Sequence, residues 1–363
     1  MLFLFLFSCR SEPTARDLNW VSFDAHVHSS LGSNDTDGTG TPELLMTMMQ
    51  ERDLDYVFLT DHSNSLGSMH CEDVEDCPNL GPEETDGDWG TNVFLGAEIS
   101  PREEEGSLSK GTGHIGCLPL ENDFSDVRFI DRPFGEITGK DAIDQCHEAN
   151  GFAVLHHPFG PVSWVSFDWT SMDFDGVEIY NGGAGFDVSD EKTLIFWEEQ
   201  VQQGNIFIPI GSSDSHKWKT EAPGTILDAA LGWSQSKIGL EADVSFSTKE
   251  LEHGRIFLGD PSSQLFYEIR NHHQILYPGE ESTLEEDTSL HVEFSSSDSG
   301  LQMEIRHIRA DGIETIFKQD VSTIPQETDL SLIESGYYYV RLMPKEITLG
   351  TRGFAMGNVI SLK

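Results

Sequence analysis

Residues 24–28, Asp24-Ala-His26-Val-His28, close an apolar run that begins at Val21 and predicts the first β-strand. In a strand, side chains at positions i and i+2 point to the same side, so His26 and His28 are expected to face one site. Imidazole nitrogens are common ligands of Zn, Fe and other transition metals. The stretch therefore predicts a metal-binding site at the end of a strand.

Similar polar groups follow other predicted strands. They are Asp61-His62, Glu98, His114, His156-His157-Pro158 and Asp214-Ser-His216. A single histidine at a strand end is usually an ordinary polar residue, but the repetition is informative because the carboxyl ends of barrel strands meet on one face. About nine ligands exceed the needs of one ion, so we expect two or three divalent ions of Zn, Mn or Fe.

Apolar runs alternate with helical patterns over most of the chain, which is typical of a parallel α/β architecture. Helices are expected at 41–53, 140–149, 191–203 and 247–253, and the long acidic and glycine-rich loop 63–91 is either a lid or a plain surface insertion. After residue 260, short alternating runs predict a small antiparallel sandwich. The expected organisation is an export signal and linker at 1–19, a metallohydrolase barrel at 20–260 and a β-rich domain at 261–363.

The chain carries a formal net charge of −41, with only 22 Lys and Arg residues. Nucleic acids and anionic membranes bind through basic side chains, so this charge argues against both as partners. A small-molecule substrate is expected instead. The sequence carries no signal for a particular oligomeric state.

The first residues, Met1 to Phe7, are almost entirely apolar, and Leu6-Phe7-Ser8-Cys9 resembles a bacterial lipobox. The run is too short to span a bilayer. We therefore expect an exported lipoprotein that contacts a membrane only through a lipid on Cys9, although no basic residue precedes the run and Phe7 is bulky for its position. A stray apolar tail is the alternative.

Four further cysteines carry separate expectations. Cys71 and Cys77 can close a small loop in an oxidising compartment. Cys117 and Cys146 lie in apolar segments, and we expect them to be buried thiols. The cysteine spacing does not favour a zinc site.

The ordered series of ligand-type residues resembles the PHP (polymerase and histidinol phosphatase) superfamily over about residues 22–260. This resemblance implies a distorted (β/α)₇ barrel with a trinuclear metal centre and, most commonly, phosphoesterase activity. Position by position, it implies these metal ligands: His26, His28, Asp37, His62, Glu98, His114, His157, Asp214 and His216.

Two positions in that series have competitors. Asp35 competes with Asp37, and Asp37 is preferred because Gly38 and the start of a helix follow it; the alternative is a turn in which both carboxylates are solvated. His156 competes with His157, and His157 is preferred because it precedes Pro158.

The segment Gly254-Arg255-Ile-Phe-Leu-Gly259 and the β-rich tail resemble the carbaryl-hydrolase-like branch of this superfamily. That branch implies hydrolysis of esters, carbamates or phosphoesters. Many of its members are exported.

The first expected function is hydrolysis of a small phosphoester by water activated between clustered metals. Carboxyl ester or carbamate hydrolysis on the same site is the alternative. The proton donor to the leaving group is expected to be Asp61 or His216, although Asp61 can also act by orienting its neighbours. Arg102, Lys217 and Lys219 are candidate phosphate contacts, with exposed loop positions as the other interpretation.

A different class of function is a non-catalytic metal- or glycan-binding surface lipoprotein. In that case the tail domain would bind the partner. The complete ligand series favours the enzyme.

Overall fold

The computed structural model describes residues 14–62, 89–101, 113–120, 137–159, 173–183, 185–222, 224–225, 228–348 and 350–363. The predictions for Cys9, for Cys71 and Cys77, for most of the 63–91 loop and for Arg102 lie outside these residues. Within them, no helix is both long enough and apolar enough to cross a membrane.

In the first sheet, strand β1, which contains Asp24 and His26 and ends just before His28, lies between β9 and β2. Strand β1 pairs in parallel with β2, and β2 pairs in parallel with β3, whereas β9 lies antiparallel to β1 and β10 antiparallel to β9. These strands are β1 (Asn19–Val27), β2 (Tyr56–Leu59), β3 (Val93–Leu95), β9 (Gln235–Leu240) and β10 (Ile256–Gly259).

The second sheet has five strands in the order β4-β5-β6-β7-β8. Its last three strands are parallel, but β5 runs antiparallel to both of its neighbours. The strands are β4 (Ala97–Ile99), β5 (His114–Pro119), β6 (Gly151–His156), β7 (Gly176–Asn181) and β8 (Ile208–Ser212).

The structure confirms the α/β class that was predicted. Over the described residues it does not show the distorted (β/α)₇ barrel, because the strands form two separate sheets. Their ladders, as far as the structure describes them, do not join into one barrel. Single bridges connect Val27 with Ser215 and His62 with Glu98. The expected parallel arrangement is not kept at β5, which runs antiparallel to both β4 and β6. Both bridges nevertheless lie where ligand-type residues gather.

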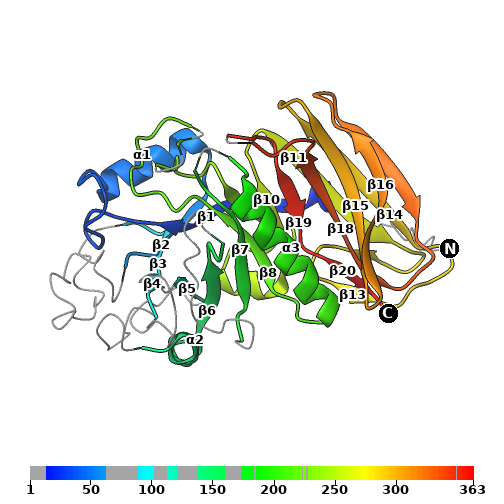
Figure 1. The fold of residues 1–363 in the computed structure, drawn as a ribbon, viewed down its shortest axis with the longest axis horizontal. Coiled ribbons are helices and arrows are strands. Elements are labelled where there is room, and N and C mark those ends of the chain that lie inside the picture. The colour runs from blue at the N-terminus through cyan, green and yellow to red at the C-terminus, as the bar shows by residue number, and fades with distance from the viewer. Residues whose placement is uncertain are drawn as a thin grey trace, which may run out of the picture.

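The predicted helices are confirmed with small shifts of their ends. Helix α1 (Pro42–Arg52) begins at a proline after the N-cap Thr41, whose side chain accepts the N–H of Leu44, as the sequence indicated. Helix α2 (Gly139–Glu148) and helix α3 (Val188–Gln203) pack on the second sheet. Residues Thr248–His253 form a 3₁₀ helix rather than an α-helix. Figure 1 shows α3 lying across β7 and β8.

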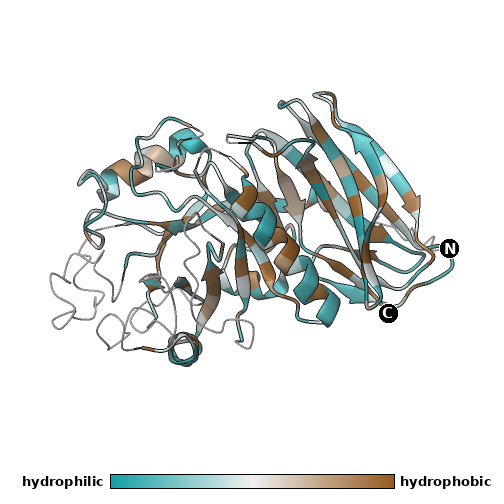
Figure 2. Ribbon diagram, in the orientation of Figure 1, coloured by the Kyte–Doolittle hydropathy of each residue, from teal (hydrophilic) through white to brown (hydrophobic). Residues whose placement is uncertain are grey.

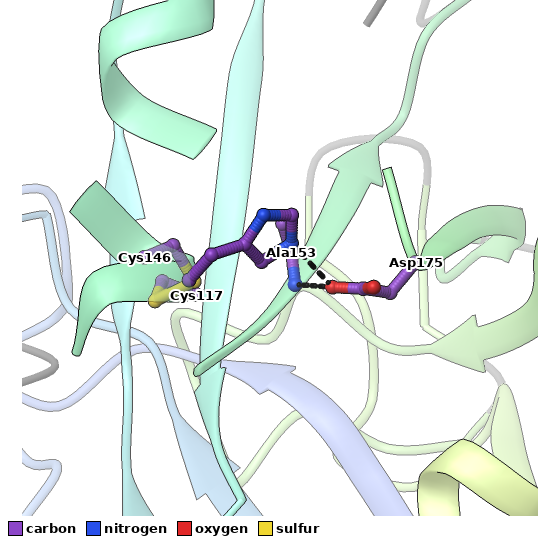
Figure 3. The surroundings of a disulfide bond; sticks show 5 residues. Cys117, Cys146, Ala153 and Asp175 are labelled. Atoms are coloured by element: carbon purple, nitrogen blue, oxygen red, sulfur yellow. Dashed lines mark hydrogen bonds and ion pairs between the residues drawn. A yellow bond between two sulfur atoms is a disulfide. The ribbon is translucent and has the colours of Figure 1, made fainter. Parts of the chain in front are cut away.

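The prediction that Cys117 and Cys146 are free thiols is wrong, because the two residues form a disulfide between β5 and α2. Figure 3 shows the pair beside strand β6, where Asp175 accepts the backbone N–H of Ala153 at 2.7 Å. Both cysteines are buried, as expected. The apolar pattern predicted their burial but held no information about which side chains would meet.

The C-terminal residues form the expected antiparallel layers. One four-stranded sheet has the order β12-β11-β14-β17, and it faces strands β15, β16 and β18, whose apolar residues share its core. Alternating hydropathy is visible along these strands in Figure 2. The main strands are β11 (Ser263–Arg270), β14 (Ser289–Ser296), β15 (Leu301–Arg309), β16 (Gly312–Asp320), β17 (Gln326–Ser331) and β18 (Gly336–Pro344). The short strands are β12 (Ile275–Leu276), β13 (Glu281–Ser282), β19 (Ala355–Gly357) and β20 (Ile360–Leu362).

The two parts of the chain share a sheet across residue 260. Strand β19 pairs with β10 on one side and with β18 on the other, so the first sheet continues into the C-terminal layers. The side chain of Glu198 on α3 adds an ionic link to Arg306 on β15, at 2.7 Å. The C-terminal layers are therefore bonded to the sheet that carries His26 and His28.

Candidate metal centre

A bulge in β1 directs both histidines of the first motif inward. The pairing of β1 with β2 shifts register between Asp24 and Val27. Phe23 and Ala25 lie in one buried core, whereas Val27 packs with helix α1 in another. Bulges commonly re-aim side chains next to active sites. The shift leaves His26 and His28, both fully buried, facing the same group of carboxylates.

Four acceptor groups converge at the end of β1. The Nε2 atoms of His26 and His28 are 3.1 Å apart, and the Oδ1 atom of Asp214 lies 3.3 Å from each. Glu98 places one carboxylate oxygen 3.1 Å from His26 Nε2 and the other 3.4 Å from His28 Nε2. This is the densest part of the cluster.

The hydrogen bond at Nδ1 fixes the tautomer of both His26 and His28. His26 Nδ1 lies 3.1 Å from Glu178 Oε1, a carboxylate oxygen that can only accept a hydrogen bond when ionised. His28 Nδ1 lies 3.2 Å from Ser33 Oγ, and the single hydroxyl proton of Ser33 is donated to Asp61 Oδ1 at 2.8 Å. Both Nδ1 atoms are therefore the donors in the neutral rings. Both Nε2 atoms then carry lone pairs and point at carboxylates.

Lone pairs packed against carboxylates inside a protein are strongly unfavourable unless a cation or proton lies among them. The donor set of imidazole nitrogens and carboxylate oxygens suits Zn²⁺, Mn²⁺ or Fe. Without a metal, protons take that place. Burial opposes the charged form of His26, but the carboxylates of Asp214, Glu98 and Glu178 raise its pKa well above the usual value. The residues present therefore fit a divalent ion.

A second group surrounds Glu98 on its other side. His114 Nδ1 lies 2.7 Å from Glu98 Oε1, and His157 Nε2 lies 3.3 Å from the same oxygen and 3.2 Å from His114 Nδ1. His62 Nδ1 is 3.1 Å from Glu98 Oε2 and has no hydrogen bond of acceptable geometry. A buried nitrogen aimed at a carboxylate in this way is a second sign of a ligand site.

A third group forms at the exposed edge of the cluster. Asp35 Oδ2 lies 3.1 Å from His62 Nε2 and 3.3 Å from His216 Nε2. His216 Nδ1 lies 3.0 Å from the backbone oxygen of Asp214, which leaves its Nε2 free to face Asp35. Burial opposes the charged form of His62, but the carboxylates of Glu98 and Asp35 raise its pKa to about 10. The three groups share members, so they form one continuous cluster.

Two cluster residues have left-handed backbone conformations. His157 has φ of 26° and Asp214 has φ of 54°. Non-glycine residues rarely adopt positive φ, and such strain is concentrated at functional sites. The backbone N–H of His157 donates to Glu178 Oε2 at 2.7 Å, and the N–H of Asp214 donates to the carbonyl of His26 at 2.8 Å. These bonds hold both strained residues beside β1.

The structure brings eight of the nine expected metal ligands together and leaves Asp37 outside. Asp37 Oδ1 accepts the N–H of Thr39 at 2.9 Å in a local turn. Asp35 lies in the cluster in its place. The turn and the site use the same residue types in adjacent positions, so the sequence alone did not separate them.

His156 and His157 both reach Glu98. His156 Nδ1 lies 3.3 Å from Glu98 Oε1, and its ring stacks on His26 with centroids 3.8 Å apart. Its Nε2 occupies the space over Gly116, where a β-carbon would come within 2.1 Å. Burial and the neighbouring His26 lower the pKa of His156 to about 4. His156 is therefore neutral and forms a candidate ligand group with His26 and Glu98, whereas His157 lies nearer the open side of the cluster.

Asp61, a candidate proton donor, and Lys217 and Lys219, the candidate phosphate contacts, lie outside the group of metal-ligand candidates. The Asp61 carboxylate accepts the N–H and the hydroxyl of Ser29, both at 2.6 Å, besides the hydroxyl of Ser33. Lys217 is paired with Asp228, and Lys219 is exposed. These contacts place Asp61 behind His28.

Sequence reasoning missed Glu178, which links four parts of the site. It contacts His26, the backbone of His157, the hydroxyl of Ser212 and the amide of Asn181. Burial opposes the charged form of Glu178, but its hydrogen bond to His26 and the charges of His26, His156 and His157 together lower its pKa to about 2. The available signal was a single acidic residue inside an otherwise apolar strand, Gly176–Asn181.

No protein-family model and no curated protein matches the chain. Solved structures that are similar to it include the following two. One is a two-domain protein from Bacteroides vulgatus containing a predicted PHP-like metal-dependent phosphoesterase, with 13% identity and a TM-score of 0.45, over 97% of this chain and 98% of that one. The other is endonuclease Q bound to a 27-mer duplex with an abasic lesion, with 13% identity and a TM-score of 0.40, over 64% of this chain and 56% of that one. These likenesses are distant, so the proposals below rest on the residues of the site.

Proposed function

We propose that the chain is a metal-dependent hydrolase of a small phosphoester. The observation that carries the proposal is the convergence of four acceptor groups: the Nε2 atoms of His26 and His28 each lie within 3.4 Å of the other and of carboxylate oxygens of Glu98 and Asp214. Such a set has no stable arrangement without a cation or protons. Two flanking groups of the same chemistry support a centre of two or three ions.

The residues of the cluster divide into a buried part and a part that is exposed to solvent. His26, His28 and Glu98 are almost completely buried, whereas the side chains of Asp35 and His216 are 43% and 25% exposed. Among the described residues, substrate can therefore approach past the second set, beside the partly exposed Asp214. Divalent ions held here would acidify water and neutralise charge on the group under attack.

The chain's own residues supply orientation and a proton path. Glu178 and Ser33 hold the two β1 histidines in the ligand tautomer. We propose His216 as the proton donor to the leaving group, because it lies at the open side; since its Nδ1–H is donated to the Asp214 carbonyl, donation from Nε2 requires the imidazolium form, in which His216 is not a metal ligand. We propose a positioning role for Asp61, since its oxygens are occupied by Ser29 and Ser33.

Hydrolysis of a neutral ester or carbamate is the second candidate. The specific observation in its favour is the ion pair of Lys217 with Asp228, which neutralises one of the cations expected to bind a phosphate. A neutral substrate would also meet less repulsion from the charge of −41. This is the substrate range that the resemblance to the carbaryl-hydrolase-like branch implied.

The test is a metal-dependent rate measured on four substrates. The purified chain is stripped with a chelator, reloaded with Zn²⁺, Mn²⁺ or Fe²⁺, and assayed with p-nitrophenyl phosphate, bis-p-nitrophenyl phosphate, p-nitrophenyl acetate and a naphthyl carbamate. Glu98→Gln is the matched control, because it keeps the shape of the side chain but removes its charge. Metal-dependent cleavage of a phosphoester that is lost in Glu98→Gln supports the proposal.

Other outcomes decide against it. Cleavage of the acetate or carbamate alone would favour the second candidate. Turnover of none of the four under metal loading, with the metals bound, would favour the non-catalytic metal- or glycan-binding alternative.

We also propose that the chain is an exported lipoprotein with its lipid at Cys9. The buried Cys117–Cys146 disulfide supports export, because such bonds persist mainly in oxidising compartments. Incorporation of labelled palmitate into the wild-type chain but not into Cys9→Ala tests the anchor.

A further inference from the structure

A cavity lies where strands β1, β9 and β10 pass under β11, and none of its lining residues belongs to the metal cluster. Its volume is about 80 Å³, and about 490 Å³ when the open mouth is included. Six residues define its chemistry: Trp20, Gln235, Lys237, Phe257, Asp260 and Phe266.

The cavity occupies the outer face of the first sheet. Val21, Ile238 and Ile256 fill the core on the other face, so their neighbours in sequence point outward. Trp20 lies opposite Gly239, and Lys237 lies opposite Phe257. A β-carbon on Gly239 would come within 2.8 Å of the Trp20 ring, so the glycine makes room for the indole.

Aromatic rings form the wall of the cavity. The centroid of Trp20 lies 4.8 Å from that of Phe257 and 5.8 Å from that of Phe266. Trp20 and Phe266 are only partly buried, so their faces are accessible from the cavity. Such a wall favours a flat apolar ligand.

Gln235 supplies an unmatched polar group at the same place. Its side chain is 4% exposed, and its Oε1 atom has no hydrogen-bond partner. A buried acceptor left unpaired costs about 1–3 kcal/mol. A ligand that donates one hydrogen bond would remove that cost.

The charges around the cavity disfavour an ionised ligand. Lys237 would repel a cation, while burial lowers its pKa against the pull of Asp53 and Asp55. Those two carboxylates would repel an anion. A neutral ligand avoids both penalties.

We infer that this cavity binds a small neutral aromatic molecule that donates one hydrogen bond, of the phenol or indole class. Stacking would take place on Trp20 and Phe257, and the donor would bind Gln235 Oε1. The inference is independent of the proposed hydrolase.

The test uses indole, phenol and toluene as probes of the full chain, with saturation-transfer NMR and calorimetric titration. Indole and phenol should bind saturably and more tightly than toluene. Gln235→Leu should weaken indole binding about fivefold, leave toluene unchanged and keep or raise the melting temperature, because the unpaired acceptor is gone.

A second variant keeps the test decisive if Gln235→Leu folds poorly. Gln264 lines the mouth and is exposed, so Gln264→Trp should fold normally and weaken all three probes by obstructing entry. Absence of saturable indole and phenol binding to the wild-type chain would overturn the inference. Equal indole affinity in wild type and a folded Gln235→Leu would also overturn it.

Discussion

The hydroxyl of Ser33 joins Asp61 to His28: its oxygen lies 2.8 Å from Asp61 Oδ1 and 3.2 Å from His28 Nδ1. Because the hydroxyl has one proton and gives it to the carboxylate, it accepts the proton of His28 Nδ1. This arrangement leaves His28 Nε2 as a lone pair facing Glu98 and Asp214. Partners of this kind set the tautomer and orientation of metal-binding histidines.

Ser33→Ala is therefore expected to weaken metal binding by about 10- to 100-fold. The matched control is Ser30→Ala, since the Ser30 hydroxyl accepts the N–H of Gly40 at 2.7 Å and does not contact the cluster histidines. Competition with a fluorescent chelator measures both. Equal affinities in Ser33→Ala and wild type would remove the role given to Ser33.

Asp35 and Asp37 provide a direct comparison of neighbouring carboxylates. Asp35→Asn should lower hydrolysis at least tenfold, because Asp35 Oδ2 contacts His62 and His216. Asp37→Asn should retain near wild-type activity, because Asp37 accepts hydrogen bonds from Thr39 in a local turn, outside the cluster. Rates and bound metal are measured for both variants. The reverse ranking would restore the sequence-based choice of Asp37.

The buried Asp260 carboxyl should make stability depend on pH. Burial raises its pKa to about 7, despite hydrogen bonds from the hydroxyl of Tyr180 and the backbone of Gly353 and Phe354. The folded state thus holds a proton that the unfolded chain releases near pH 3.8. The contribution of Asp260 to stability is therefore complete below pH 3.8 and is lost as the pH rises from there through about 7.

Asp260→Asn removes this titration while keeping an acceptor for the backbone. The free energy of unfolding of the wild-type chain should therefore fall relative to that of the variant between pH 5 and pH 8. Urea unfolding in the presence of a chelator measures this difference without a metal contribution. A difference that stays constant over this range would show that Asp260 does not titrate there.

Glu198 should be critical for the link between α3 and the C-terminal strands. Its carboxylate contacts Arg306 at 2.7 Å and the hydroxyl of Tyr339 at 2.5 Å, and Arg341 lies within 3.6 Å. Glu198→Ala leaves two largely buried guanidinium groups without this partner, so unfolding should become easier by about 3–5 kcal/mol. Asp320→Ala, which breaks an exposed pair with Lys345, should change stability little. Urea unfolding of both variants tests this, and similar losses would contradict it.

The sequence predicted the helix starts, the strand-end ligands and the antiparallel C-terminal layers because these depend on local patterns. Thr41-Pro42 is a local signal, and His26 and His28 follow a simple alternation. What the sequence did not reveal depends on distant contacts. The β1 bulge, the split of the barrel into two sheets and the Cys117–Cys146 pair each require knowledge of which segments meet.

The candidate site shows the same division. Residue type and strand position identified His62, His114 and Asp214 without any structure. Glu178 was hidden because a carboxylate in an apolar strand has meaning only when its partner is known. Asp35 and Asp37 differ only in how the turn directs their side chains, and this direction cannot be predicted from residue type.

The most direct test of the central claim is the metal content of tag-free protein, determined by inductively coupled plasma mass spectrometry after gel filtration. The account predicts two or three equivalents of Zn, Mn or Fe per chain, and loss of this metal in the His26→Ala/His28→Ala double variant. Metal content near zero in folded wild-type protein, persisting after incubation with each ion, would contradict it.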